Sequence, residues 1–298
     1  MHIVIVDSSR VVLKVITGLL EPRGHVVNTF TDSAAARIFL EETPSVRVLI
    51  TSLEVRPLTG LELCWAARLL AEARRPLYVI TMSSARNARN LAEALDSGAD
   101  DFIEKPPSAE ELHARLRAAE RLTTMQDELI RLAETDSLTG LLNRRAFFAR
   151  VGAVAERAGN HGTLSAVLVD IDHFKRINDE HGHDVGDAAI RAVSELLGAQ
   201  GIAGRLGGEE FAVVLPGLSL TEAEAVAGRL RHQVRDLRLR GTRGPVRLTC
   251  SFGVSTWCEG DSVTALTKRA DIALYEAKTT GRDRVVSAET DIVLARAG

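Results

Sequence analysis

RLGGEEFAVVL, residues 205–215, decides the fold of the C-terminal half of this 298-residue chain. The stretch predicts two strands joined by a hairpin at Gly207-Gly208, because glycine adopts tight-turn conformations that other residues avoid. Upstream, Leu164–Asp170 is an apolar run that ends in a carboxylate, as a buried strand does when it delivers a polar group to the edge of a sheet. We therefore expect the strand ends to bring Asp170 close to the two glutamates of the hairpin.

Helices and further strands surround this hairpin. The patterns predict helices at Arg145–Ala158, Glu222–Leu239 and Ser262–Thr279, and strands at Val246–Ser255 and Arg284–Val286. Shorter helical segments follow Asp172 and residues 182–187. This order of elements predicts an α+β domain with a mainly antiparallel sheet.

The first 105 residues alternate short β-branched runs with helical periodicity. Strands are expected at Ile3–Val6, His25–Thr29, Val46–Thr51, Leu77–Thr81 and Asp101–Ile103, and helices at Val11–Leu20, Ala34–Glu41, Leu61–Ala71 and Ala88–Ser97. Five β-α repeats predict an α/β fold with a doubly wound parallel sheet. Function in such sheets lies at the carboxyl ends of the strands, which places Asp7, Ser52, Thr81 and Lys105 around one pocket.

A long helix is expected after Pro106. It begins near Ser108 and meets no breaker before about Glu134, which makes it roughly 40 Å long at 1.5 Å per residue. Its apolar residues Leu122, Met125, Leu129 and Leu132 alternate at steps of three and four, the spacing of a short coiled-coil seam. A single amphipathic helix lying on one domain is the alternative. The expected segments are residues 1–107, the helix 108–134, a second domain 135–288 and a tail 289–298.

Composition and charge exclude several function classes. The net charge is −3 and the basic residues are scattered, so nothing indicates a nucleic-acid-binding surface or a helix-turn-helix regulator. The basic run 229–243 is interpreted as a solvated helix face. Cys64, Cys250 and Cys258 form no CxxC pair, which fits a reducing compartment. Because no apolar stretch is long enough for a signal peptide or a membrane span, we expect a cytoplasmic protein without membrane or nucleic-acid partners.

The carboxylates of the second half predict a cation site. Adjacent carboxylates at two strand ends repel each other unless a cation joins them, and oxygen ligands suit Mg²⁺. Few protein ligands are needed if a triphosphate supplies the rest, and Lys175 in the turn after Ile171 is suited to phosphate. We do not expect a transition-metal site at His173, His181 and His183, because triphosphate chemistry uses Mg²⁺ with oxygen ligands. An acidic hairpin alone is usually only a solvated turn.

Several further motifs, which occur in the order typical of a known family, favour the cation site over a solvated turn. Residues 135–288 resemble a GGDEF domain, the diguanylate cyclase family. The matching stretches are DSLTGL and NRR within 136–145, DIDHFKRIND at 170–179, GHDVGD at 182–187, GGEEF at 207–211, SFGV at 251–254, ADIALYEAK at 270–278 and GRDRV at 281–285. Glu209 replaces the aspartate of the signature and keeps the carboxylate.

The resemblance implies a role for each matching residue. Asp170, Glu209, Glu210 and the backbone carbonyl of Ile171 hold two Mg²⁺ ions, with Mn²⁺ as a substitute. Asn178 and Asp187 read the guanine edge, Lys175, Lys278 and Arg282 bind the β- and γ-phosphates, and Phe174, Gly207 and Gly208 complete the substrate site. The catalytic residues are Glu209, Glu210 and Arg205, which steadies charge at the reacting phosphate.

The reaction implied by the family is attack of a ribose 3′-hydroxyl on an α-phosphate, which joins two GTP into cyclic di-GMP and releases pyrophosphate. Because one domain binds one GTP, we expect a homodimer formed through the first domain and the helix 108–134. The alternative is a non-catalytic signalling module that binds GTP or partners; the intact carboxylates favour the enzyme. The family's RxxD product-inhibition site is missing, since residues 198–201 read GAQG.

Residues 1 to about 120 resemble a response-regulator receiver domain, in VDSSR at 6–10, GLEL at 60–63 and GADDFIEKP at 98–106. That family has two adjacent acids after its first strand, and here the second is Ser8. Ser52 stands where the phosphoacceptor aspartate is expected, while Thr81 matches the family's switch hydroxyl and Lys105 its lysine. We therefore predict a pseudo-receiver that is not phosphorylated. Three roles stay open for it: a dimerisation platform, the dock for a regulatory protein, or a sensor of something other than phosphate.

Overall fold

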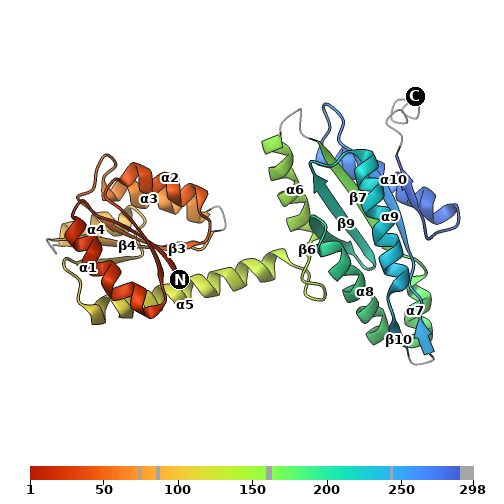
Figure 1. The fold of residues 1–298 in the computed structure, drawn as a ribbon, viewed down its shortest axis with the longest axis horizontal. Helices are drawn as coiled ribbons and strands as arrows, with labels where there is room; N and C mark the ends of the chain where they lie inside the picture. The colour runs from red at the N-terminus through yellow and green to blue at the C-terminus, as the bar shows by residue number, and fades with distance from the viewer. Residues whose placement is uncertain (73–74, 85–87, 159–162, 242–243, 289–298) are drawn as a thin grey trace. The chain divides into compact units, whose positions relative to one another are not determined.

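Residues 1–72, 75–84, 88–158, 163–241 and 244–288 are described by a computed structural model, in which the chain divides into two units, Met1–Arg131 and Leu132–Gly298 (Figure 1). Within these described ranges we find no helix with the length and apolar character that crossing a membrane requires. The three cysteines are free thiols.

The first unit is built on a parallel sheet with strand order β2-β1-β3-β4-β5. Its strands are β1 (His2–Val6), β2 (Val26–Phe30), β3 (Val46–Ser52), β4 (Tyr78–Ser83) and β5 (Asp101–Glu104). The helices between them are α1 (Arg10–Leu20), the short η1 (Glu21–Arg23), α2 (Ser33–Glu42), α3 (Gly60–Glu72) and α4 (Ala88–Asp96). The expected doubly wound sheet is confirmed.

Helix α5 (Ala109–Glu134) belongs partly to the core of the first unit. Leu112, Leu116 and Ala119 are buried in the same cluster as Ile103 of β5. The later apolar positions are exposed, with Leu122 at 46 %, Met125 at 61 %, Leu129 at 63 % and Leu132 at 61 %. The helix is therefore a packed element in its first half and carries an uncovered apolar row in its second half.

The second unit contains a six-stranded sheet with the order β13-β12-β7-β9-β8-β6. Its strands are β6 (Leu142–Asn143), β7 (Leu164–Ile171), β8 (Ile202–Gly207), β9 (Glu210–Pro216), β12 (Cys250–Thr256) and β13 (Val285–Ser287). The central strand β7 is antiparallel to both neighbours, and only the outer pairs β6–β8 and β12–β13 are parallel. The expected α+β class is confirmed.

Helices cover both faces of this sheet. On one face, α6 (Arg144–Ala158) and α10 (Val263–Thr279) pack with Ala166, Leu168 and Ala212. On the other, α7 (Phe174–His181), α8 (His183–Gly198) and α9 (Leu220–Asp236) pack with Val169 and Phe211. Alternation along β7 and β9 thus sends Leu168 and Asp170 toward α6 and α10, and their odd-numbered neighbours toward the other helices.

The predictions were wrong between residues 236 and 250. The helix expected to reach Leu239 ends at Asp236, because Leu237 takes an extended conformation with φ −59° and ψ 139°. β10 (Leu239–Gly241) then pairs antiparallel with β11 (Gly244–Val246). The strand expected at Val246–Ser255 is split, since Val246 belongs to this ribbon and β12 begins only at Cys250. The basic run is therefore divided between a helix end and the ribbon.

Candidate active site

Carboxylates of the second unit meet at one edge of the sheet. The antiparallel register of β7 and β9 pairs Asp170 with Glu210, and Glu209 lies in the adjoining turn between β8 and β9. Gly208 has φ +38° in that turn, a conformation that is strained for any residue with a side chain. The hairpin inferred from the sequence thus places its acidic residues beside Asp170.

Asp170 is neutralised by the last turn of α10. Nζ of Lys278 lies 2.6 Å from Oδ2 of Asp170. Burial nevertheless raises the pKa of Asp170 to about 6; Lys278 opposes that rise, and the charges of Glu209 and Glu210 add to it. The carboxylate edge therefore carries more negative charge than one lysine compensates.

This edge fits a hard cation only in combination with other ligands. Within the described ranges, no three or more His, Cys, Asp or Glu side chains gather closely enough to hold a metal by themselves. The donors present, Asp170 and Glu210 with Glu209 at the turn, are the oxygen type that Mg²⁺ prefers. Asp170 is buried, Glu209 is partly exposed and Glu210 is exposed. An excess of negative charge beside an incomplete ligand set suits a metal that arrives with the oxygens of a triphosphate.

Asp172, two residues after Asp170, has a structural role that the sequence analysis missed. It is 4 % exposed, and its oxygens accept hydrogen bonds from Thr249 Oγ1 at 2.7 Å, Ser251 Oγ at 2.7 Å and the amide of Asp283 at 3.0 Å. These bonds fix the loop after α10 to the end of β7. The signal available in the sequence was the second carboxylate at a strand end.

The loop after α10 holds Arg282 next to Lys278. Arg282 and Asp283 have φ values of 62° and 45°, and the amide of Arg282 donates to the carbonyl of Ala277 at 2.9 Å. Two non-glycine residues in this region cost roughly 1–3 kcal/mol each, and such strain is concentrated at functional sites. The side chain of Arg282 is exposed. Two cations are thus available at this end of α10.

Asn178 and Phe174 of α7 pack closely against Gly186 of α8. A Cβ added to Gly186 would stand 1.9 Å from Oδ1 of Asn178 and 3.2 Å from Cζ of Phe174, so only glycine leaves room for both side chains. Oδ1 of Asn178 is buried, and no described residue hydrogen-bonds to it. Asp187 follows Gly186 directly, and Lys175 is exposed one turn before Asn178. An unsatisfied buried acceptor is costly unless a ligand pairs with it.

Arg205 holds the hairpin turn. Its NH1 lies 3.0 and 3.2 Å from the two carboxylate oxygens of Asp136, and its Nε and NH2 donate to the carbonyl of Gly208 at 2.9 and 2.7 Å. Burial would raise the pKa of Asp136, but hydrogen bonds from Thr139 and Arg205 outweigh it and hold that pKa below the ordinary value. The structure therefore assigns Arg205 a positioning role, and its contact with phosphate stays a prediction.

The pocket of the first unit is closed by a lysine. Nζ of Lys105 lies 2.6 Å from Oδ2 of Asp7, 2.5 Å from Oγ of Ser52 and 3.4 Å from Oε2 of Glu54. Thr81 instead donates to the carbonyl of Asp101 at 3.2 Å, and Ser8 is exposed. Asp7, Ser52 and Lys105 thus meet as expected, whereas Thr81 and Ser8 take no part in this cluster.

Each of the two units matches a known protein family. Residues 133–284 match the diguanylate cyclase GGDEF domain, and residues 3–117 match the response regulator receiver domain. The response regulator PleD of Caulobacter vibrioides is 36 % identical over 256 residues, which cover 81 % of this chain and 56 % of PleD. The diguanylate cyclase VdcA of Vibrio cholerae is 41 % identical over 177 residues, 57 % of this chain and 50 % of VdcA. The chain therefore spans about half the length of these relatives.

Solved structures agree for the second unit. The coiled coil and GGDEF domain of DgcB from Caulobacter crescentus, in complex with c-di-GMP, superposes with a TM-score of 0.55 at 33 % identity, over 59 % of this chain and 99 % of that chain. The diguanylate cyclase SiaD of Pseudomonas aeruginosa, in complex with its activator SiaC, gives a TM-score of 0.51 at 34 % identity, over 60 % and 75 %.

Proposed function

The chain belongs to the diguanylate cyclase GGDEF family and carries an N-terminal receiver domain, and we propose that it condenses two GTP into cyclic di-GMP and two pyrophosphates. The observation that carries the proposal is the pairing of Asp170 with Glu210 across two strands, with Lys278 at 2.6 Å from Asp170. Cation-binding carboxylates and a phosphate-binding lysine are thereby available at one edge. The similarity to relatives named diguanylate cyclases supports the same activity.

Guanine is recognised by polar side chains where α7 meets α8. Asp187 accepts hydrogen bonds from N1–H and the exocyclic amine of guanine, a pair of donors that adenine does not present. Asn178, whose Oδ1 has no described partner, pairs with the same base, and Phe174 lies beside Asn178 against Gly186. Selectivity for GTP over ATP follows from these donors and acceptors.

The triphosphate lies along the cationic end of α10. Lys278, Arg282 and Lys175 bind the β- and γ-phosphates, and the Gly207-Gly208 turn, held by Arg205, lets the nucleotide approach the backbone. Asp170, Glu209, Glu210 and the carbonyl of Ile171 are the residues that would hold two Mg²⁺ ions, or Mn²⁺ in their place. When bound, the metal lowers the pKa of the attacking hydroxyl and neutralises charge on the phosphates.

Each bond forms between two nucleotides. The 3′-oxygen of one GTP bonds to the α-phosphorus of the other as its proton leaves, and the bond from that phosphorus to the bridging oxygen breaks, releasing pyrophosphate. A second, reciprocal transfer closes the ring. Since one domain holds one GTP, two catalytic units must meet, and the chain acts as a homodimer.

The exposed apolar row of α5 supports pairing of two copies. Leu122, Met125, Leu129 and Leu132 are uncovered and spaced as a seam, and the DgcB structure named above contains a coiled coil. We infer that this pairing orients the catalytic units and so sets their activity. Inserting two to four residues near Met125 changes the orientation, and unchanged activity in such variants would contradict this regulation.

The first unit acts as a pseudo-receiver. Ser52 offers a hydroxyl in place of a carboxylate nucleophile, and Lys105 already neutralises Asp7. Its role is then to pair two copies or to dock a regulatory protein, and SiaD is an example of a relative solved with its activator.

Incubation of the purified chain with GTP and Mg²⁺, followed by chromatography of the nucleotides, tests the activity. The cyclase produces cyclic di-GMP, and Glu210→Ala, the negative control, does not. The second candidate, a module that only binds GTP, is favoured by the buried Oδ1 of Asn178, which has no described hydrogen-bond partner. That candidate would bind GTP without consuming it.

A further inference from the structure

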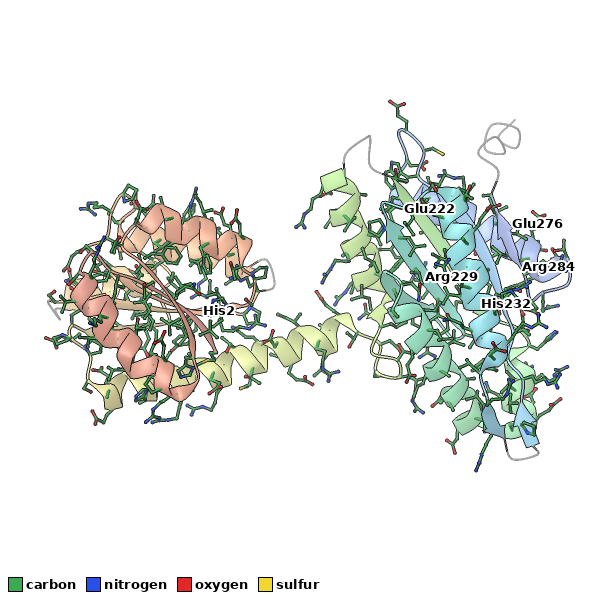
Figure 2. All side chains as sticks on the ribbon, in the orientation of Figure 1. His2, Glu222, Arg229, His232, Glu276 and Arg284 are labelled. Atoms are coloured by element: carbon green, nitrogen blue, oxygen red, sulfur yellow. The ribbon has the colours of Figure 1, made fainter. Side chains whose placement is uncertain are left out.

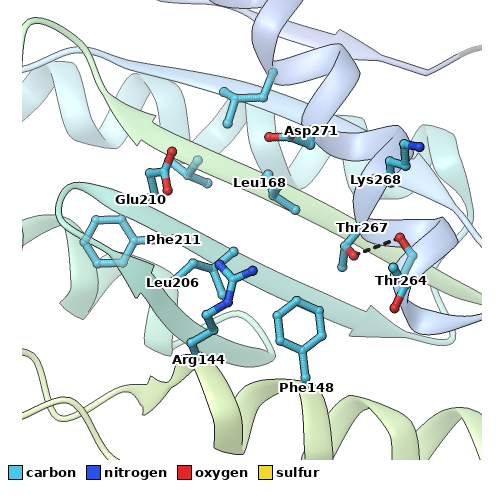
Figure 3. A pocket seen from close by; sticks show the side chains of 12 residues that line it. Arg144, Phe148, Leu168, Leu206, Glu210, Phe211, Thr264, Thr267, Lys268 and Asp271 are labelled. Atoms are coloured by element: carbon cyan, nitrogen blue, oxygen red, sulfur yellow. Dashed lines mark hydrogen bonds between the residues drawn. The ribbon is translucent and has the colours of Figure 1, made fainter.

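A cleft opens on the face of the sheet toward which Asp170 and Glu210 point. It has a volume of about 630 Å³ and lies between α6 and α10, with Leu168 in its floor and Glu210 at one end (Figure 3). Arg144 and Phe148 line it from α6, and the Arg144 guanidinium lies 5.5 Å from the centre of the Phe148 ring. Lys268 and Asp271 line it from α10. We call this feature the α6–α10 cleft.

The outer side of α10 continues the rim of the cleft as an uncovered row. Lys268, Asp271, Ile272 and Tyr275 are exposed and, at about 100° per residue, lie within about 60° of the direction of Tyr275. Ile272 is 53 % exposed and Tyr275 is 69 % exposed. Apart from Leu132 on α5, they are the only large apolar side chains of the second unit, within the ranges described, that are left exposed. We call these four residues the α10 row.

The row begins next to the reacting edge. Lys278, which contacts Asp170, follows Tyr275 by one turn, about 4.5 Å along the axis, and follows Lys268 by about 15 Å. Bond formation requires the two nucleotides to approach to about 3–3.5 Å. A specific interface covers about 800 Å² on each partner, a disc of about 16 Å radius, so an interface centred on this edge extends to Lys268.

We propose that the α6–α10 cleft and the α10 row together receive the catalytic unit of a second copy of this chain. This inference rests on the proposed function, because the reaction is what brings a second unit to this edge. It adds the surface through which the two units touch. Isolated exposed apolar residues need no explanation, but Ile272 and Tyr275 lie one turn apart beside the edge where the second nucleotide must arrive.

The charges of the surface suit contact with its own copy. A two-fold interface brings the same patch from both subunits together, so the patch must be self-complementary. Besides Glu210, the proposed metal ligand, the cations Arg144 and Lys268 and the anion Asp271 line the cleft. Lys268 of one copy can therefore pair with Asp271 of the other. No hydrogen bond or ion pair to another described residue occupies Lys268 or Asp271, so both remain available to a partner.

Aspartate substitutions test the apolar part of the surface in the full chain. Ile272→Asp and Tyr275→Asp place a charge on exposed positions and leave the core unchanged. The control is Ala225→Asp at an exposed position of α9, on the opposite side of the sheet, where Glu222, Arg229 and His232 are labelled in Figure 2. We expect both row variants to lower the rate of cyclic di-GMP formation by about tenfold or more, the effect of removing an interface hot spot.

A measurement of nucleotide affinity distinguishes damage to the interface from damage to the GTP site. Affinity for 3′-deoxy-GTP, which lacks the attacking hydroxyl, should stay within about threefold of wild type in both row variants, a difference well below 1 kcal/mol. Row variants as active as Ala225→Asp would overturn the inference and leave the proposed function intact. A wild-type chain that forms no cyclic di-GMP would overturn both.

Charge reversal tests self-complementarity. Lys268→Glu makes the patch net negative and Asp271→Lys makes it net positive, so each variant alone repels its own copy. Co-expressed, the two variants meet as opposite charges, and we expect the mixed dimer to be more active than the mean of the two separate variants. A mixture no better than that mean would contradict a two-fold contact through this surface, whatever the fold stability of each variant.

Discussion

Lys278 Nζ lies 2.6 Å from Asp170 Oδ2, where the last turn of α10 meets the end of β7. Two residues that are 108 positions apart in the sequence thus form one ion pair at the edge of the sheet. The same edge receives Glu210 from β9; burial raises the pKa of Asp170 to about 6, and the charges of Glu209 and Glu210 add to that rise. In the proposed cyclase, cation and nucleotide together complete this charge balance.

Substitution of Gly186 tests the proposed contact between Asn178 and guanine. Gly186→Ala places a Cβ about where Oδ1 of Asn178 now lies, so Asn178 must move away from the base. We expect the Kd of GTP to rise about tenfold or more, measured by titration of a fluorescent GTP analogue. Gly228→Ala is the matched control, because a Cβ there meets nothing within 4 Å. The control removes a helical glycine and should stabilise the fold by up to about 1 kcal/mol. Equal affinity for GTP in both variants would contradict the proposed contact between Asn178 and guanine.

Asp136→Asn tests the support of the hairpin turn. The substitution removes the charge that holds Arg205, so we expect slower cyclic di-GMP formation. We also expect a loss of about 1.5–3 kcal/mol in the free energy of unfolding at pH 7, the usual range for hydrogen bonds to charged groups. Urea unfolding measures that loss.

Acid should remove the difference between wild type and Asp136→Asn. The pKa of Asp136 lies below its ordinary value of 3.8 in the folded chain, so its contribution to stability is present above pH 3.8 and is lost as the pH falls through the folded pKa. The gap between the two unfolding curves therefore shrinks below pH 3.8. A gap that widens in acid would show that Asp136 is not stabilised as an anion.

Lys105→Met tests the ion pair of the pseudo-receiver. Asp7 is 1 % exposed, and without Lys105 its charge is buried and uncompensated. Such a loss typically costs about 3–5 kcal/mol. The double variant Asp7→Asn/Lys105→Met should recover most of that stability, as seen in chemical denaturation followed by circular dichroism. If the single variant is as stable as the double variant, Asp7 is not charged in the pocket.

Exposure to a phosphoryl donor tests whether the first unit, with Ser52 at the phosphoacceptor position, can be phosphorylated. After incubation with acetyl phosphate and Mg²⁺, the intact mass of the chain should be unchanged, because Ser52 presents no carboxylate to attack phosphorus. A phosphorylatable receiver protein in the same tube serves as the positive control. A hydroxylamine-labile gain of one phosphoryl group on this chain would contradict the pseudo-receiver.

Local sequence patterns were enough to predict most of the helices and strands and the carboxylates of the site. The runs at Leu164–Asp170 and Glu210–Leu215 alternate between faces of one sheet. The antiparallel register of these two strands then brings Asp170 beside the hairpin. The break at Leu237 was not predicted, because the sequence from Glu222 onward keeps helical periodicity up to Leu239. The turn conformation at Leu237 and the pairing of Leu239 with Val246 depend on contacts distant from that window.

Side-chain partnerships were less accessible from the sequence. Arg205 was assigned to phosphate, but its observed partners are Asp136, 69 positions earlier, and the backbone of Gly208. Asp172 appeared only as part of a motif, yet it fixes the loop that carries Arg282 through the amide of Asp283. Such pairings depend on how units of the fold pack, which spacing along the chain does not encode.

Release of pyrophosphate tests the central claim most directly. Wild-type chain, GTP and Mg²⁺ are combined, and pyrophosphate and cyclic di-GMP are quantified in the same reaction, with ATP in a parallel one. The cyclase yields two pyrophosphates for each cyclic di-GMP from GTP and neither product from ATP. GTP that stays intact, or pyrophosphate formed without cyclic di-GMP, would contradict the account.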